Sequence, residues 1–184
     1  MTGPEFTWIF HNYSVDDPKW SKGLDEFFYT DQPTKEHIQF RHLFVDNNTN
    51  ISPFIQYICG PLMLCFEQNT GMKIKHIQRI KANLLMKQDG PHLQVPHCDG
   101  MDLVNGVPVA KGRYTLLYYV DDSDGETMLY DKHYEGQPLG LVKESQRVAA
   151  KKGRCVIFDS NQIHSGTCPA VTDYRMVVNC VFGV

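Results

Sequence analysis

The fold class is decided by residues 113–130, which read RYTLLYYVDDSDGETMLY. Residues 113–120 and 127–130 form two short segments rich in aromatic and β-branched side chains, a composition typical of β-strands. Between them, Asp124-Gly125 is a sequence typical of turns. The stretch therefore predicts two strands that are joined by a turn.

The same alternation of short segments and turns extends in both directions from this stretch. Further strand-like segments occupy residues 76–87, 154–158 and 175–182. Asp89-Gly90-Pro91 and Lys152-Gly153 supply turn signals between them. Short strands separated by turns predict a mainly β protein, built as a β-sandwich or a barrel.

The region before this β-rich part has a different pattern. In residues 51–66 the apolar side chains recur at helical spacing, which predicts a helix that supports the core. Gly60-Pro61 interrupts the pattern, so we expect two short helices or a kink there. The chain thus combines N-terminal supporting helices with a β core.

The length of 184 residues favours one domain, residues 1–184, with a core at about 75–182 and a supporting region at 1–74. The chain has no apolar run of the roughly 18 residues that a membrane span needs. Net charge is -3 and the basic residues are scattered, so no dedicated nucleic-acid surface is expected. The N-terminus does not resemble a secretory signal, and the six cysteines lack C-x-x-C spacing, which favours a cytoplasmic protein with reduced thiols.

Candidate metal ligands flank the predicted strands. His97-Cys98-Asp99 follows one strand segment, and His164 follows residues 155–158 after a short loop. Two imidazoles and one carboxylate on one face of an octahedral ion leave three positions open, as a non-haem Fe(II) oxygenase requires. His133-Tyr134-Glu135 offers a rival pair, but no strand is expected after it, and we do not expect it to bind a metal.

Arg175 begins the last predicted strand, eleven residues after His164. Fe²⁺ with one carboxylate carries one net positive charge, and a dianionic 2-oxo acid would reverse it. A buried cation must then meet the distal carboxylate of that acid. Arginine can bind a carboxylate with two hydrogen bonds and stays charged, so we expect Arg175 to fill this role.

Four motifs in order resemble the prolyl 4-hydroxylase-like branch of the 2-oxoglutarate/Fe(II) oxygenases, whose small members occur in bacteria and phages. They are VPHCD (95–99), YTLLYYVDDSDGET (114–127), GRCVIF (153–158) and HSG (164–166). The resemblance spans about residues 75–182 and implies a double-stranded β-helix, or jelly roll. It also implies Fe(II), the co-substrate 2-oxoglutarate, and O₂.

The resemblance assigns roles to single residues. The iron ligands of the family fall on His97, Asp99 and His164, and the co-substrate anchor falls on Arg175. Strand periodicity places Thr115 and Tyr119 on one face, and the resemblance selects that face for co-substrate binding, with the Tyr119 hydroxyl on the carboxylate.

Two asparagines accompany this set. Asn83 lies on the strand segment that precedes the ligands and can contact substrate or co-substrate. Asn179 lies four residues after Arg175 on the same strand face, and the sequence assigns it no role.

The implied reaction is oxidative decarboxylation of 2-oxoglutarate to succinate and CO₂, coupled to hydroxylation of a substrate. Retention of Asp99 disfavours halogenation. Collagen-type prolyl hydroxylases carry lysine at the anchor, so Arg175 leaves the primary substrate open among peptidyl proline, free amino acids, other small metabolites and nucleobases. Residues 132–146 and the first fifty are expected to form pocket walls.

Two alternatives from other classes remain open. One is a cupin-like metal isomerase or a 2-oxoglutarate-independent dioxygenase, which would not need Arg175. The other is a non-catalytic jelly-roll module for binding or structure, in which the histidines and the aspartate are incidental.

Overall fold

The computed structural model describes residues 6–11, 28–35, 38–99, 102–104, 107–109 and 112–184. Its first elements are β1 (Ile9–His11), β2 (Phe28–Tyr29), β3 (Gln39–Asp46), β4 (Thr49–Asn50), α2 (Ile55–Thr70), β5 (His76–Met86), β6 (Asp102–Val104) and β7 (Val107–Val109). They are followed by β8 (Arg113–Tyr119), β9 (Ser123–His133), β10 (Gly140–Leu141), β11 (Glu144–Ala150), β12 (Cys155–Asp159), β13 (Gln162–Gly166) and β14 (Tyr174–Gly183).

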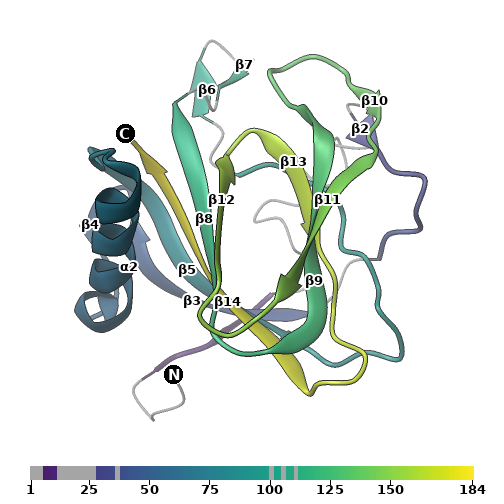
Figure 1. Ribbon diagram of the computed structural model, residues 1–184, viewed down its shortest axis with the longest axis horizontal. Coiled ribbons are helices and arrows are strands. Elements are labelled where there is room, and N and C mark those ends of the chain that lie inside the picture. Colours follow the sequence, from purple (N-terminus) through teal and green to yellow (C-terminus); the bar gives the residue numbers. More distant parts are fainter. Residues whose placement is uncertain (1–5, 12–27, 36–37, 100–101, 105–106, 110–111) are drawn as a thin grey trace.

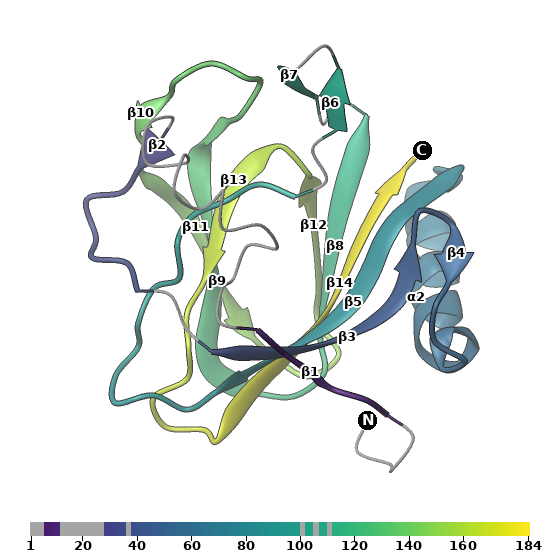
Figure 2. The same cartoon turned by 180° about the vertical axis from the view of Figure 1, so that it is seen from behind.

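Two antiparallel sheets make up the body of the protein. The larger has the order β1-β3-β5-β14-β8-β12, with β4 added beside β3, and the smaller has the order β11-β9-β13. Figures 1 and 2 show the two sheets facing each other with the long strands β8 and β9 leading from one to the other. The predicted mainly β fold of the jelly-roll type is confirmed.

Among the described residues one helix, α2, supports the sheet, and it covers the outer face of the larger sheet (Figure 1). It runs through Pro61 without interruption, so the prediction of two short helices is wrong. Gly60 and Pro61 lie on the exposed side of α2, where water can solvate the carbonyl group that proline leaves without a hydrogen bond. The helix ends at Gly71, whose left-handed conformation (φ 73°) directs its N–H to the Glu67 carbonyl.

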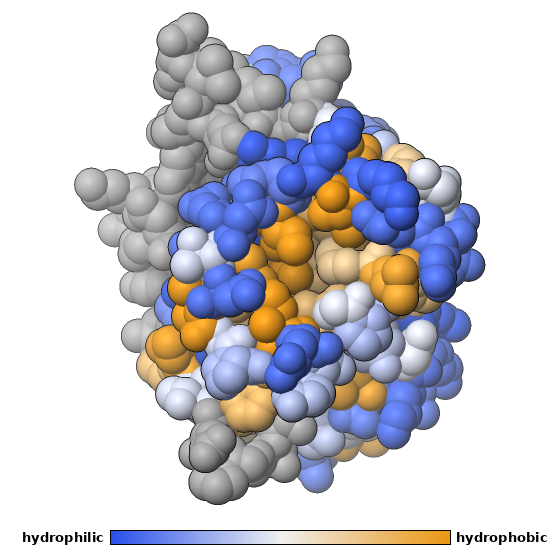
Figure 3. Space-filling model, turned by 90° about the vertical axis from the view of Figure 1, so that its left-hand side faces the viewer, coloured by the Kyte–Doolittle hydropathy of each residue, from blue (hydrophilic) through white to orange (hydrophobic). Residues whose placement is uncertain are grey.

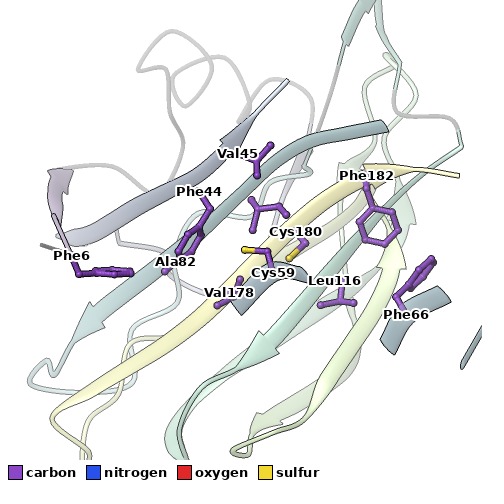
Figure 4. Packing of buried hydrophobic residues seen from close by; sticks show 11 residues of the cluster. Phe6, Phe44, Val45, Cys59, Phe66, Ala82, Leu116, Val178, Cys180 and Phe182 are labelled. Carbon is purple, nitrogen blue, oxygen red and sulfur yellow. The ribbon is translucent and has the colours of Figure 1, made fainter. Parts of the chain in front are cut away.

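The main hydrophobic core lies between α2 and the larger sheet. Figure 4 shows Cys59 and Phe66 of α2 against Val178, Cys180 and Phe182 of β14. Successive residues of a strand point to opposite faces, so the even-numbered residues here fill this core and the odd-numbered ones point between the two sheets. The space between the sheets is therefore lined by a separate set of side chains.

The exposed side of α2 carries apolar residues too, including Tyr57 and Leu64. Figure 3 views the molecule from this side and shows apolar groups at the centre of the face within a rim of polar ones. In the part of the chain that the structure describes, no helix has both the length and the apolar character that a membrane span needs.

The turn that was predicted at Asp124-Gly125 lies inside strand β9, so this prediction is wrong. The Asp124 carboxylate accepts hydrogen bonds from the backbone N–H groups of residues 170–172, at 2.8 to 2.9 Å. A Cβ atom on Gly125 would lie 2.7 Å from Arg175 Cδ and 2.7 Å from the Thr167 carbonyl oxygen. Both residues therefore serve contacts with the loop before β14 and with β14 itself, not a turn.

The expectation that no strand follows His133 is also wrong. His133 ends β9, and β11 follows and pairs with it. The His133 side chain is exposed, and its Nε2 lies 3.7 Å from Asp159 Oδ2 at the surface. His133 and Glu135, the rival pair, are not part of the cluster of potential metal ligands found among the described residues.

Candidate metal and co-substrate site

Three predicted ligands meet between the sheets. The ligand atoms of His97, Asp99 and His164 all lie within 4.8 Å of one another. His97 and His164 form an antiparallel bridge, in which each backbone N–H donates to the other's carbonyl at 2.9 and 2.8 Å. The Asp99 N–H donates to the Ser160 carbonyl at 2.8 Å. Backbone pairing with β13 and its preceding turn thus holds the His97–Asp99 loop in place.

The two histidines are both oriented through Nδ1. His97 Nδ1 lies 3.1 Å from the Val95 carbonyl oxygen, and His164 Nδ1 lies 2.9 Å from that of Gln162. A carbonyl only accepts, so Nδ1 carries a proton in each ring, and Nε2 is the ring nitrogen that can bind a metal. Burial, followed by the neighbouring His164, lowers the pKa of His97 to about 4, so this ring is neutral at pH 7. Neutral imidazoles of this kind are metal ligands.

The Asp99 carboxylate is buried and accepts three hydrogen bonds. Arg79 Nη2 donates to Oδ1 at 3.1 Å, while Asn179 Nδ2 and Thr115 Oγ1 donate to Oδ2 at 2.9 and 3.2 Å. Burial acts to raise the pKa of Asp99, but His164, Arg79 and His97 outweigh it and hold the pKa well below its usual range. Asp99 is therefore an oriented, ionised carboxylate.

These contacts give roles to residues that the sequence had placed differently or had missed. Thr115 was expected at the co-substrate, whereas the structure places its hydroxyl on Asp99 and 3.0 Å from the Ser160 hydroxyl. Asn179 had no assigned role and contacts Asp99. Arg79 is not among the predicted site residues, although its spacing of four residues from Asn83 puts both on the inner face of β5.

A second polar group lies around Arg175, whose side chain is 4% exposed. Arg175 Nη2 and the Tyr119 hydroxyl both donate to Thr127 Oγ1, at 2.6 and 2.8 Å. The guanidinium carbon lies 5.7 Å from the centre of the Tyr119 ring. Gly125 and Gly166 leave room for this side chain, since a Cβ on Gly166 would lie 3.3 Å from Nη1. Burial lowers the pKa of Arg175, but arginine remains charged.

A cavity joins the two groups. Its lining comprises Asn83, Gln94, His97, Leu117, Thr127, His164, Ser165, Gly166, Arg175, Val177 and Asn179. Four of the polar atoms in this lining are buried without a hydrogen-bond partner: Asn83 Oδ1, Gln94 Nε2, Arg175 Nε and Asn179 Oδ1. Buried polar groups normally have partners, so the cavity is built for a polar occupant. A buried guanidinium at one end suits a carboxylate, and the 2-His-1-carboxylate set at the other suits Fe(II).

Lys81, which the sequence did not single out, lies on the same face of β5 between Arg79 and Asn83 and is 5% exposed. Burial lowers the pKa of Lys81 well below its usual range, and Arg79 and Arg41 add to the effect while Asp99 opposes it. A buried lysine beside a candidate metal site was invisible in the sequence, because lysine in a strand is usually a solvated residue.

The sequence profile of the 2OG-Fe(II) oxygenase superfamily matches residues 82–183, more than half of the chain. The chain belongs to this superfamily. Fe(II) and 2-oxoglutarate are the cofactor and co-substrate typical of its members, and the His97/Asp99/His164 cluster is a candidate for the facial triad of a 2OG-Fe(II) oxygenase. The matched segment contains these three residues together with Arg175.

Solved structures of similar fold include 2OG oxygenases of several kinds. An oxidoreductase of the 2OG-Fe(II) oxygenase family from Burkholderia pseudomallei is 14% identical, with a TM-score of 0.54 over 80% of this chain and 68% of that one. The α-ketoglutarate-dependent carbocyclase SnoK of nogalamycin biosynthesis is 8% identical (TM-score 0.57, 97% and 80%). The epimerase SnoN of the same biosynthesis is 11% identical (TM-score 0.55, 97% and 79%). No curated protein matches the sequence. At these identities the likeness concerns the fold alone.

Proposed function

We propose that this 2OG oxygenase is a hydroxylase of the prolyl 4-hydroxylase-like branch, in which His97, Asp99 and His164 hold Fe(II) and Arg175 anchors 2-oxoglutarate. One observation carries the proposal. Two imidazoles and an ionised carboxylate converge beside a cavity that a buried guanidinium also lines. The charges also balance, since Fe²⁺ and Arg175 together offset Asp99 and a dianionic co-substrate.

Different residues of the chain hold the metal and the co-substrate in this proposal. Carbonyl groups on Nδ1 direct both imidazoles toward the metal position, and Arg79, Thr115 and Asn179 fix the carboxylate. Tyr119 and Thr127 orient Arg175 toward the distal carboxylate of the co-substrate. When bound, iron and 2-oxoglutarate supply the oxidising power, with succinate and CO₂ as co-products.

Apolar side chains complete the site. Leu117 and Val177 line the cavity together with His97, His164 and Arg175. Exclusion of water strengthens the electrostatic interactions inside the cavity and protects a reactive site from side reactions. Asn83 lines the same cavity with a buried acceptor and is a second candidate for contact with the co-substrate.

The proposal is tested by succinate formation. Purified protein is supplied with Fe(II), 2-oxoglutarate and O₂, and succinate is measured across a substrate panel that begins with prolyl peptides and includes free amino acids, other small metabolites and nucleobases. We expect stimulated succinate release that His97→Ala abolishes. His133→Ala is the matched control: this histidine is exposed and its Nε2 lies 3.7 Å from Asp159 Oδ2 at the surface, so the variant must leave the rate unchanged.

The alternatives give different results in the same assay. A cupin-like isomerase or a 2-oxoglutarate-independent dioxygenase would convert a substrate without forming succinate and would tolerate Arg175→Ala. A non-catalytic module would bind no stoichiometric metal. Succinate formation that survives His97→Ala would contradict the assignment of the iron ligands.

A further inference from the structure

The inner face of β5 carries a basic side chain for which the proposed reaction has no use. Lys81 is paired with Asn179 of β14 in the sheet, and Arg79 is paired with Val181. Strand alternation places Lys81 on the same face as Arg79, which contacts Asp99, and as Asn83, which lines the cavity. Lys81 therefore faces the candidate metal site from the larger sheet.

The ammonium group of Lys81 has no compensating partner among the residues that the structure describes. The side chain is 5% exposed, and within the described parts of the chain no hydrogen bond or ion pair joins it to another residue. Among the described charged groups that act on it, Arg79 and Arg41 are cations and Asp99 is the one anion. Asp99 already accepts three hydrogen bonds. Burying an uncompensated ammonium is costly, so this site is organised for an anion that arrives from outside.

Further basic groups lie on the neighbouring strands. β1, β3 and β5 lie side by side, as Figure 2 shows, and Arg41 of β3 is paired with Asn83 of β5 and with Ile9 of β1. His11 of β1 has a buried Nε2 without a hydrogen-bond partner. Burial lowers the pKa of His11, and the charges of Arg41 and Lys81 add to this effect. The described charged groups around the Lys81 side chain are thus predominantly positive, and a site of this kind attracts anions.

The co-substrate does not account for this positive site. Arg175 is paired with Leu85, whereas Lys81 is paired with Asn179, four residues further along β14. At the rise of an extended strand this separates the two positions by about 13 Å. Arg175 lines the cavity, whereas Lys81 is paired with Asn179, which contacts Asp99. An anion at Lys81 therefore belongs to the other reactant, the primary substrate.

We propose that Lys81 binds an anionic group of the primary substrate, a carboxylate or a phosphate, and so holds the substrate beside the metal position. The proposal rests on the proposed function and narrows its substrate class to small anionic molecules. Among the candidates named above it favours free amino acids and phosphorylated or carboxylated metabolites over a prolyl peptide with neutral flanking residues. Lys81 is a specificity residue in this scheme, with no part in the chemical step.

The first test measures binding in the absence of turnover. Inorganic phosphate is titrated anaerobically into protein loaded with Mn(II), with and without 2-oxoglutarate, and thermal unfolding is followed. We expect phosphate to protect wild type and Lys81→Arg, and its apparent affinity to fall about 10- to 100-fold in Lys81→Met, the effect of losing a hydrogen bond to a charged group. Lys152→Met, at an exposed lysine, is the matched control and must bind phosphate as wild type does.

Two further readouts separate a specificity role from a structural one. Lys81→Met removes a buried charge in favour of an apolar side chain of similar size, so the ligand-free variant must be at least as stable as wild type. Its affinity for 2-oxoglutarate in the presence of Mn(II) must stay within about twofold of wild type, a smaller change in binding free energy than the loss of one hydrogen bond to a charged group causes.

The second test uses succinate release with matched substrate pairs. Each carboxylate is compared with its primary amide, and each phosphate monoester with its dephosphorylated alcohol, which distinguishes the two sources of negative charge. We expect the anionic member of an active pair to be preferred by wild type and the preference to be lost in Lys81→Met.

The inference is overturned if Lys81→Met binds phosphate as wild type does, or if wild type binds neither phosphate nor the anionic member of any pair. It is also overturned if neutral prolyl peptides are turned over as well as anionic substrates, or if 2-oxoglutarate affinity falls with loss of Lys81. Failure of the proposed function is distinct, because wild type would then not bind 2-oxoglutarate with Mn(II), whereas the phosphate titration with Mn(II) alone would still report on Lys81.

Discussion

Replacement of Asn179 by alanine tests how the chain orients its candidate iron ligand. Asn179 Nδ2 donates to Asp99 Oδ2 at 2.9 Å, and both side chains are buried. A hydrogen bond to a charged group contributes about 1.5–3 kcal/mol. Arg79 and Thr115 still hold the carboxylate in the variant, so the lower part of this range applies. We expect Fe(II) affinity to fall about 10- to 30-fold, within the range that is usual when a partner of a metal ligand is removed.

The affinity is measured anaerobically by competition with a chromogenic chelator, with Mn(II) titration calorimetry as a second method. Asn83→Ala is the matched control, because Asn83 lines the same cavity and its Oδ1 has no hydrogen-bond partner. It must leave the affinity within about twofold of wild type, a small change on the scale of a hydrogen bond. A folded Asn179→Ala variant with wild-type affinity would refute the view that Asp99 is oriented through this contact.

Three other predictions address the co-substrate end, the core and the pH dependence. Gly125→Ala places a methyl group 2.7 Å from Arg175 Cδ, so we expect a loss of about 1–3 kcal/mol in chemical denaturation and weaker 2-oxoglutarate binding in calorimetry; an unchanged variant would contradict the close approach. Phe182→Ala removes a fully buried ring whose centre lies 4.6 Å from that of the Phe66 ring, so the free energy of unfolding should fall by about 3–5 kcal/mol. The affinity for the co-substrate should be kept, because Phe182 lies on the core face of the larger sheet and not on the face that carries the site. Loss of that affinity in a folded variant would contradict this separation of the two faces. The pKa of His97 falls from 6.5 to about 4 on folding, so between these pH values the unfolded chain binds more protons than the folded one. The metal-free protein should therefore lose up to about 3 kcal/mol of stability as the pH drops from about 6.5 to 4. His97→Asn should flatten this pH dependence of stability, and an equally steep dependence in the variant would refute its assignment to His97.

Part of the fold could be read from composition and spacing. The predicted strand segments at 76–87, 113–120 and 175–182 correspond to β5, β8 and β14, whose apolar faces form the core against α2. Strands β11 and β13 were missed for a physical reason. β11 begins with four exposed polar residues, and β13 is five residues long, so neither shows an apolar alternation.

Only those residues of the candidate site that belong to sequence motifs could be predicted from the sequence. His97, Asp99, His164 and Arg175 were visible because their chemistry and order are specific to one kind of oxygenase. Thr115 was placed on the correct strand face, but its partner Asp99 lies sixteen residues away in the sequence and no local rule connects them.

The basic residues of β5 show the limit of reading a sequence by local pattern. In the sequence, Arg79 and Lys81 alternate with apolar residues, a pattern equally typical of a strand with a solvated face. Only the second sheet, which covers that face, leaves Arg79 half-buried on Asp99 and Lys81 buried next to it on the strand. Their burial therefore arises from sheet packing, not from spacing along the chain.

The central claim is tested most directly by the visible charge-transfer band that Fe(II) and 2-oxoglutarate give when they bind together in such a site. The protein is loaded with Fe(II) anaerobically, 2-oxoglutarate is added, and wild type is compared with His97→Ala, Arg175→Ala and the control His133→Ala. The account predicts a band in wild type and His133→Ala that is lost in His97→Ala and weakened in Arg175→Ala. A folded, iron-loaded wild type without the band, or a band that His97→Ala leaves intact, would contradict it.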